Sequence, residues 1–214
     1  IEKLLLEGCE RTAPKRAESC MSKIADLTAS LVAGDKGLVG EKNFSTLSAP
    51  GDMGEALLEK LKIPCDVVLC PKAHTSSAKD TKLCAQIMKE QGVDLLVFCG
   101  GDGTARDICE AVGTDVTVLG IPAGVKMYSA CYACNPYQAG EMLAGWLEGK
   151  EMSYEMREVL DIEEKDLDSR NVSPQLYGFL EVLSDGKHLQ KAKELDLGSG
   201  ESATIIARAA ILRM

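Results

Sequence analysis

The stretch DLLVFCGGDGTARDI, residues 94–108, decides the fold of this chain. After Asp94, residues 95–99 form a continuous apolar run, which is typical of a strand buried on both faces of a parallel sheet. The run ends in Gly-Gly-Asp-Gly, and apolar residues then recur at helical spacing over 104–113. Asp-Gly between two apolar runs also favours a tight β-hairpin. The helical spacing argues against a hairpin, so residues 100–104 are predicted to form a strand-to-helix turn.

Strands and helices alternate along the first 150 residues. The predicted strands are 43–50, 65–69, 94–99 and 116–122, and the predicted helices are 13–31, 55–62, 77–91, 104–113 and 136–149. This alternation predicts a Rossmann-like, doubly wound α/β domain over residues 1–150. Two further strand-like runs, 153–164 and 175–184, have no helix between them. They predict a smaller β-containing second domain over 151–214, which a C-terminal helix closes.

The composition narrows the classes of partner. Among 214 residues, 24 Lys+Arg stand against 33 Asp+Glu, for a formal net charge of −9. This balance argues against nucleic acid or an anionic membrane as a partner, because both recruit basic surfaces. No apolar run reaches the roughly 18 residues that a membrane-spanning helix needs. We also expect no secretory leader, since the first residues soon become polar and charged.

The nine cysteines are odd in number and scattered, which is typical of reduced thiols in a cytoplasmic protein. The single C-x-x-C, Cys131 to Cys134, leaves a redox pair as an alternative. A second pair at zinc-site spacing is missing, and His74 and His188 lie far away in the sequence. A zinc site is therefore not expected.

The glycine turn favours a phosphate ligand. Glycine permits positive φ, and without a Cβ the N–H groups of Gly100, Gly101 and Gly103 can approach a ligand oxygen closely. The helix that begins near Thr104 adds a partial positive charge of about half a unit. Asp102 would repel phosphate unless it binds Mg²⁺ or accepts the proton of a substrate hydroxyl. Both roles belong to phosphoryl transfer, whereas a capping Asp in an ordinary turn is the alternative.

A second apolar strand, VTVLGIPAGVKM at 116–127, repeats the arrangement. Pro122 and Gly124 form its turn, and Lys126 supplies a cation. If the two strands are neighbours, both turns lie on one edge of the sheet. Lys126 and Arg106 are then candidate cations for a bound nucleotide. A solvated surface lysine, or a surface ion pair between Arg106 and Asp107, is the alternative.

GGDGTARDI and GIPAGVKM, in this order, resemble the superfamily of NAD kinases and diacylglycerol or sphingosine kinases. The likeness is closer to the NAD kinase branch that is predicted to use ATP or polyphosphate. In that branch an upstream PGxMGE corresponds to Pro50–Glu55, and T-S/T-A-x-D-T corresponds loosely to Thr75–Thr81. The resemblance covers about residues 8 to 210. It implies an α/β domain that carries GGDGT and a β-rich domain that helps to hold NAD.

The resemblance also implies a reaction. A phosphoryl group would pass from ATP or polyphosphate, with Mg²⁺, to the 2′-hydroxyl of the adenosine ribose of NAD. Asp102 would be the carboxylate nearest to that hydroxyl, and self-association into a homo-oligomer is expected. A lipid kinase of the same superfamily and a non-catalytic nucleotide-binding protein are the alternatives. A further glycine motif, Gly198–Ala203, fits a dinucleotide fingerprint but follows a poor strand, so it is interpreted as a turn before the last helix.

Overall fold

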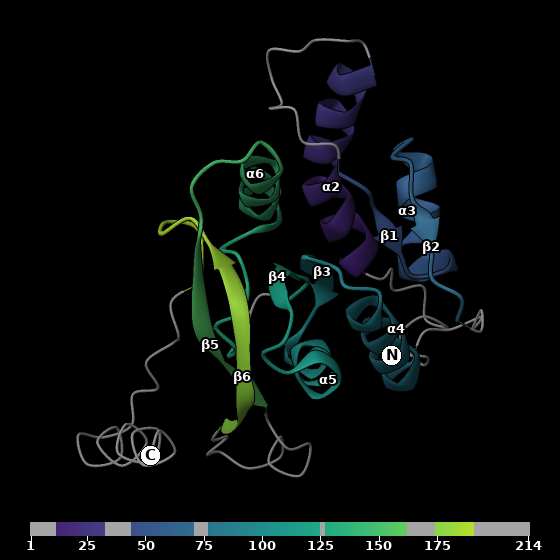
Figure 1. Ribbon diagram of the computed structural model, residues 1–214. Coiled ribbons are helices and arrows are strands. Elements are labelled where there is room, and N and C mark those ends of the chain that lie inside the picture. Colours follow the sequence, from purple (N-terminus) through teal and green to yellow (C-terminus); the bar gives the residue numbers. More distant parts are fainter. Residues whose placement is uncertain (1–11, 33–43, 71–76, 125–126, 162–173, 191–214) are drawn as a thin grey trace.

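The computed structural model describes residues 12–32, 44–70, 77–124, 127–161 and 174–190, and its helices and strands alternate over most of this length (Figure 1). The helices are α2 (Thr12–Val32), the 3-10 helix η1 (Gly51–Met53), α3 (Glu55–Lys60), α4 (Ala78–Glu90), α5 (Asp102–Val112) and α6 (Pro136–Leu147). The strands are β1 (Leu47–Ser48), β2 (Asp66–Val67), β3 (Leu95–Gly100), β4 (Thr117–Pro122), β5 (Ser153–Asp161) and β6 (Gln175–Ser184). Among the described helices, none is both long enough and apolar enough to cross a membrane.

Four strands form one mixed sheet in the order β3-β4-β6-β5. β3 and β4 run parallel from the pair Leu95–Thr117 to the pair Gly100–Pro122. β6 is parallel to β4 at one residue pair, Val118–Val182, and antiparallel to β5 along its length. β1 and β2 form a separate two-stranded parallel sheet. The prediction of an α/β fold is confirmed.

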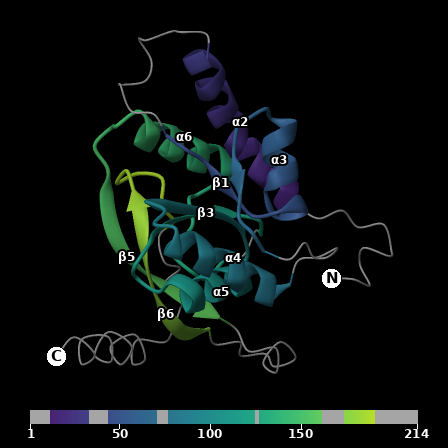
Figure 2. The same ribbon diagram turned by 45° about the vertical axis from the view of Figure 1, so that its right-hand side comes forward.

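Helices cover both faces of the β3–β4 part of the sheet. α2 and α6 pack against each other and against β4 on one face, while α5 packs against β3 on the other face with α4 beside it (Figures 1 and 2). α5 also packs against β5 and β6, so it lies where the parallel part of the sheet meets the antiparallel part. This layering is the arrangement expected of a doubly wound domain.

The two parallel strands β3 and β4 differ in burial. All six residues of β4 are buried, as expected for a strand covered on both faces. β3 instead alternates between half-buried and buried residues, with Leu96 and Phe98 in the core. The sequence predicted β3 to be buried throughout. The difference arises because β3 lies at one end of the described four-stranded sheet, where only β4 flanks it.

Helix ends follow the local sequence signals. Ser77 and Asp80 form a capping box at the start of α4: the Ser77 side chain accepts a hydrogen bond from the Asp80 N–H, and the Asp80 carboxylate accepts one from the Ser77 N–H. α5 begins at Asp102, two residues before the predicted start, because Gly101 takes the extended N-cap position. β1 and β2 each contain two residues and are shorter than the predicted strands 43–50 and 65–69.

β5 and β6 are the described part of the predicted second domain. They join the same sheet as β3 and β4, and Val159, Leu180 and Val182 belong to the same hydrophobic cluster as Val118. The boundary near residue 150 therefore does not separate two sheets in the part of the chain that the structure describes. Residues 162–173 and 191–214 lie outside that part, together with the predicted C-terminal helix and the Gly198–Ala203 motif. The division into two domains stays a prediction.

Candidate functional site

The GGDGT segment joins β3 to α5 through a single residue. Gly100 ends β3, Gly101 is the N-cap and Asp102 is the first residue of α5, so the hairpin alternative is wrong. The N–H groups of Thr104 and Ala105 both donate to the carbonyl of Gly101, over 2.8 and 3.0 Å. The N–H groups of Asp102 and Gly103 then have no acceptor within the helix, as is usual for a first turn.

The outer side of this turn is open. A Cβ atom added to Gly101 or Gly103 would meet no atom within 4 Å. Gly100 differs, because a Cβ there would lie 2.7 Å from Cγ2 of Thr104 and closer still to its Cβ and Oγ1. The absence of a side chain at Gly100 therefore allows Thr104, in the first turn of α5, to pack against the end of β3. At Gly101 and Gly103 the space beside the backbone is open, and the binding of an anion by their N–H groups stays a prediction.

The turn after β4 lies beside the turn after β3. Gly100 pairs with Pro122 at the end of the two parallel strands, and the N–H of Ala123 donates to the carbonyl of Gly100 over 2.9 Å. Pro122 is buried and Gly124 is exposed. Lys126 lies outside the described residues. The structure thus brings together the two glycine-containing turns at one edge of the sheet, which is where open α/β sheets bind their ligands.

Asp102 points towards the chain that follows the second turn. Its Oδ1 accepts a hydrogen bond from the N–H of Ser129 over 2.8 Å, and its Oδ2 accepts one from the N–H of Tyr128 over 3.0 Å. The side chain is half-buried. Two amides thus fix the orientation of the carboxylate, and since an ionised carboxylate offers about four acceptor positions, it retains capacity for a further donor.

The loop that holds Asp102 is anchored on β5. The buried Ser129 hydroxyl donates to the carbonyl of Leu160 and accepts from its N–H, both over 3.0 Å. The N–H of Ala130 donates to the carbonyl of Glu158 over 2.9 Å. The position of the Asp102 carboxylate therefore depends on the antiparallel part of the sheet as well as on β3 and β4.

Tyr132 supports the GGDGT turn from the protein interior. Its side chain is fully buried, and its hydroxyl donates to the carbonyl of Gly101 over 2.6 Å. Burial raises the pKa of this hydroxyl well above its ordinary value, so Tyr132 stays protonated as a hydrogen-bond donor. Its ring also packs edge-on against Phe98 of β3, with the ring centroids 5.5 Å apart. Tyr128, Ser129 and Tyr132 were not predicted from the sequence, because backbone amides and one core tyrosine leave no motif.

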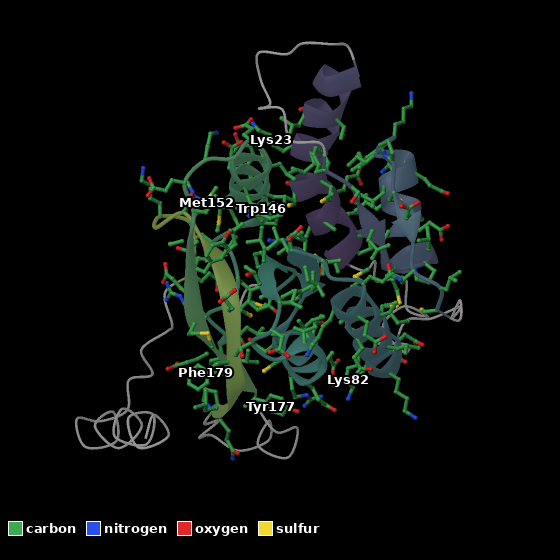
Figure 3. The ribbon with its side chains drawn as sticks, viewed as in Figure 1. Lys23, Lys82, Trp146, Met152, Tyr177 and Phe179 are labelled. Carbon is green, nitrogen blue, oxygen red and sulfur yellow. The ribbon has the colours of Figure 1, made fainter. Side chains whose placement is uncertain are left out.

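Arg106 lies one turn into α5, four residues before Glu110. The Glu110 carboxylate bonds to Lys82 of α4 and to Tyr177 of β6, and these two side chains reach α5 from neighbouring elements (Figure 3). The hydrogen bond from Lys82 is the main cause that lowers the pKa of Glu110, and the charge of Arg106 adds to the shift. The charge of Arg106 therefore acts on the Glu110 carboxylate, which is hydrogen-bonded to Lys82 and Tyr177. Its predicted contact with a nucleotide stays a prediction.

The other singled-out segments lie elsewhere in the chain. Pro50–Glu55 spans η1 and the first residue of α3, where the Glu55 carboxylate accepts a hydrogen bond from the N–H of Gly51 over 2.6 Å. In the C-x-x-C, the Sγ atom of Cys134 donates to the carbonyl of Leu189 over 3.3 Å, and burial raises the pKa of the Cys131 thiol. Burial of Cys131 as a thiol favours a packing role over the redox alternative.

A family model described as the ATP-NAD kinase N-terminal domain matches residues 10–151. The chain belongs to the ATP-NAD kinase family. The matched range contains both glycine turns, Asp102 and the loop that holds it. Comparison with curated proteins and with solved structures gave no match. Membership of the family indicates a kinase and implies the use of nucleotides, NAD among them.

A divalent cation fits the site only with help from a substrate. The described residues contain no group of three or more His, Cys, Asp or Glu side chains that could enclose a metal ion. Mg²⁺, however, is commonly bound by one or two carboxylates together with substrate phosphates and water. Asp102 is the carboxylate of the turn that could take part in such a site. When bound, the ion would offset the negative charge of the transferred phosphoryl group.

Proposed function

We propose that this member of the ATP-NAD kinase family transfers a phosphoryl group from ATP or polyphosphate to the 2′-hydroxyl of the adenosine ribose of NAD, which gives NADP. The observation that carries the proposal is the joint geometry of the two turns. The open glycine backbone of 101–103 and the carboxylate of Asp102 both lie at the N-terminal end of α5. The amide that holds this carboxylate belongs to Ser129, in the chain that follows the second turn. An anion-binding backbone next to a fixed carboxylate is what phosphoryl transfer to an alcohol requires.

In this proposal the residues of the turn have distinct roles. The N–H groups of Asp102 and Gly103, with the N-terminal end of α5, bind phosphate oxygens of the donor. The Asp102 carboxylate accepts the hydrogen of the 2′-hydroxyl and orients its oxygen towards the transferred phosphorus. Gly100, Pro122 and Gly124 shape the two turns. Thr104, Arg106 and Lys126 are the remaining candidate contacts to the nucleotides.

The orientation of Asp102 favours this role over that of a simple helix cap. A capping side chain binds the N–H groups of its own helix, whereas the Asp102 carboxylate binds the N–H groups of Tyr128 and Ser129 in another segment. α5 begins without a side-chain cap, since its N-cap residue is Gly101. The helix end is thus left for another hydrogen-bond acceptor, and Asp102 faces the adjoining turn.

The test is a coupled assay of NADP formation, run with ATP and then with polyphosphate. Asp102→Asn has nearly the same shape, and we expect it to lower turnover by about a hundredfold or more, the range of a lost general base. ATP binding should change little. Asp94→Asn is the matched control, because Asp94 is exposed and lies just before the opposite end of β3.

The outcomes separate the alternatives. Equal turnover in wild type and Asp102→Asn would remove Asp102 from the reaction. Nucleotide binding without NADP formation by the wild type would favour a non-catalytic nucleotide-binding protein. Phosphorylation of diacylglycerol or sphingosine in place of NAD would favour a lipid kinase. The expected cytoplasmic location and homo-oligomer stay predictions, the latter to be tested by light scattering of the purified chain.

A further inference from the structure

Two cysteine side chains are in contact beside the small β1–β2 sheet. Cys70 follows β2, and Cys84 lies in the second turn of α4. Their Sγ atoms are 3.0 Å apart. The two residues pack with Ala49 and Val68 in a small cluster that is separate from the main core. No part of the proposed kinase reaction uses this pair.

The distance favours bond formation between the sulfur atoms over joint metal binding. A disulfide bond is about 2.05 Å long, so the two sulfurs need to approach by only about 1 Å. Two thiolates on one tetrahedral zinc ion, each about 2.3 Å from it, would lie about 3.8 Å apart. Among the described residues, these two cysteines also belong to no group of three or more His, Cys, Asp or Glu side chains that could hold a metal ion.

The two thiols differ in their access to solvent. Cys84 is 3% exposed, whereas Cys70 is half-buried and follows Leu69, whose side chain is 95% exposed. Burial, followed by the contact with Cys70, raises the pKa of Cys84 to about 12, so Cys84 is a thiol at neutral pH. A dissolved reagent therefore reaches Cys70 first, and Cys84 is placed to react with the product.

We propose that Cys70 and Cys84 form an oxidative modification site that closes to an intramolecular disulfide when the chain meets a two-electron oxidant such as hydrogen peroxide. The sulfur of Cys70 takes one peroxide oxygen, which gives a sulfenic acid and one water. The sulfur of Cys84 then attacks the Cys70 sulfur, the S–O bond breaks, and the oxygen leaves with the Cys84 proton as a second water. In total, two thiols and one peroxide give one disulfide and two waters.

The closed bond would tie the end of β2 to α4. Cys70 and Cys84 are 14 positions apart, and the disulfide would close the segment between them into a ring. Residues 78–84 of this segment are already helical. Because the two sulfurs already lie 3.0 Å apart in the reduced fold, the bond requires an approach of only about 1 Å. Thiol–disulfide exchange with a reductant such as dithiothreitol reverses it.

The experiment uses the full chain, first reduced and then freed of reductant. After treatment with hydrogen peroxide and alkylation with N-ethylmaleimide, mass spectrometry should show an unalkylated pair that has lost two hydrogen atoms, about 2 Da. Proteolysis should give a peptide in which Cys70 is linked to Cys84. Dithiothreitol should restore both alkylation sites.

Three variants make the result specific. Cys70→Ser and Cys84→Ser should each abolish the link, whereas Cys65→Ser should retain it, because Cys65 is a half-buried cysteine close to β2 that is not part of the pair. Cys70→Ser carries the test if the buried Cys84→Ser variant fails to fold. Alkylation of both residues after peroxide, or a link from either one to a different cysteine, would overturn the proposal.

Discussion

The GGDGT turn contains two glycines that should respond to alanine in opposite directions. At Gly100 a Cβ would lie 2.7 Å from Cγ2 of Thr104 and closer to its Cβ and Oγ1. The Thr104 Cβ is attached directly to the helix backbone and cannot rotate away, so α5 or β3 must move. At Gly103, in the first turn of α5, a Cβ would meet nothing within 4 Å.

The expected magnitudes follow from these contacts. Overpacking usually costs about 1–3 kcal/mol, and the fixed position of the obstacle places Gly100→Ala near the upper end, at about 3 kcal/mol. Gly103→Ala should raise the free energy of unfolding by about 0.5–1 kcal/mol, because alanine has less backbone freedom to lose in a helix. The two variants should therefore differ by about 3.5–4 kcal/mol although their glycines are only three residues apart.

Urea unfolding followed by circular dichroism measures this difference. With a slope of about 2–3 kcal/mol per molar urea, the two midpoints should be separated by more than about 1 M. Gly103→Ala should also weaken ATP binding while it retains the fold, since the added methyl group stands on the open side of the turn. Free energies of unfolding that agree within about 0.5 kcal/mol would refute the contact between Gly100 and Thr104.

Two further predictions concern positioning and pH. Ser129→Ala leaves the half-buried N–H and carbonyl of Leu160 without their hydroxyl partner, and the two lost hydrogen bonds should cost about 1–3 kcal/mol. We expect kcat for NADP formation to fall about tenfold with little change in KM, whereas Ser153→Ala, at the exposed first residue of β5, should leave both unchanged. Equal kinetics for the two variants would contradict a positioning role. Hydrogen bonds from the Ser77 hydroxyl and N–H lower the pKa of Asp80, so its stabilising effect is present above the ordinary Asp pKa of about 3.9 and is lost as pH falls through the lowered value. Urea midpoints of wild type and Asp80→Asn should differ at pH 7 and converge near pH 2, while a difference that persists in acid would point to another cause.

The fold of the first 150 residues was largely predictable, because capping residues and hydrophobic spacing in the sequence mark the same helices and strands that pack together in the structure. The capping box at Ser77 and Asp80 marks the start of α4 in the sequence and in the structure. The helical spacing after Asp102 distinguished a strand-to-helix turn from a hairpin. The start of α5 was placed two residues late, since glycine at 101 and 103 weakens the helical signal although the backbone there already forms the cap and the first turn.

The parts of the candidate site that were not predicted depend on contacts that leave no pattern in the sequence. Asp102 was predicted as a site residue from its place between glycines, but its two partners are backbone amides, which every residue except proline carries. The attachment of β6 to β4 rests on the pair Val118–Val182, and an apolar strand does not specify its neighbour. For the same reason the contact between Cys70 and Cys84 was not foreseen.

The donors to Asp102 come from residues 26 and 27 positions further along the chain. A chain with α5 alone would display the complete GGDGT motif while its carboxylate rotated freely. The acid group acquires a defined direction only when β4 has docked beside β3 and the polypeptide has turned back over the strand ends. During unfolding, turnover should therefore vanish together with the sheet and not with the helix, which would make enzymatic rate a sensitive reporter of long-range order in this protein.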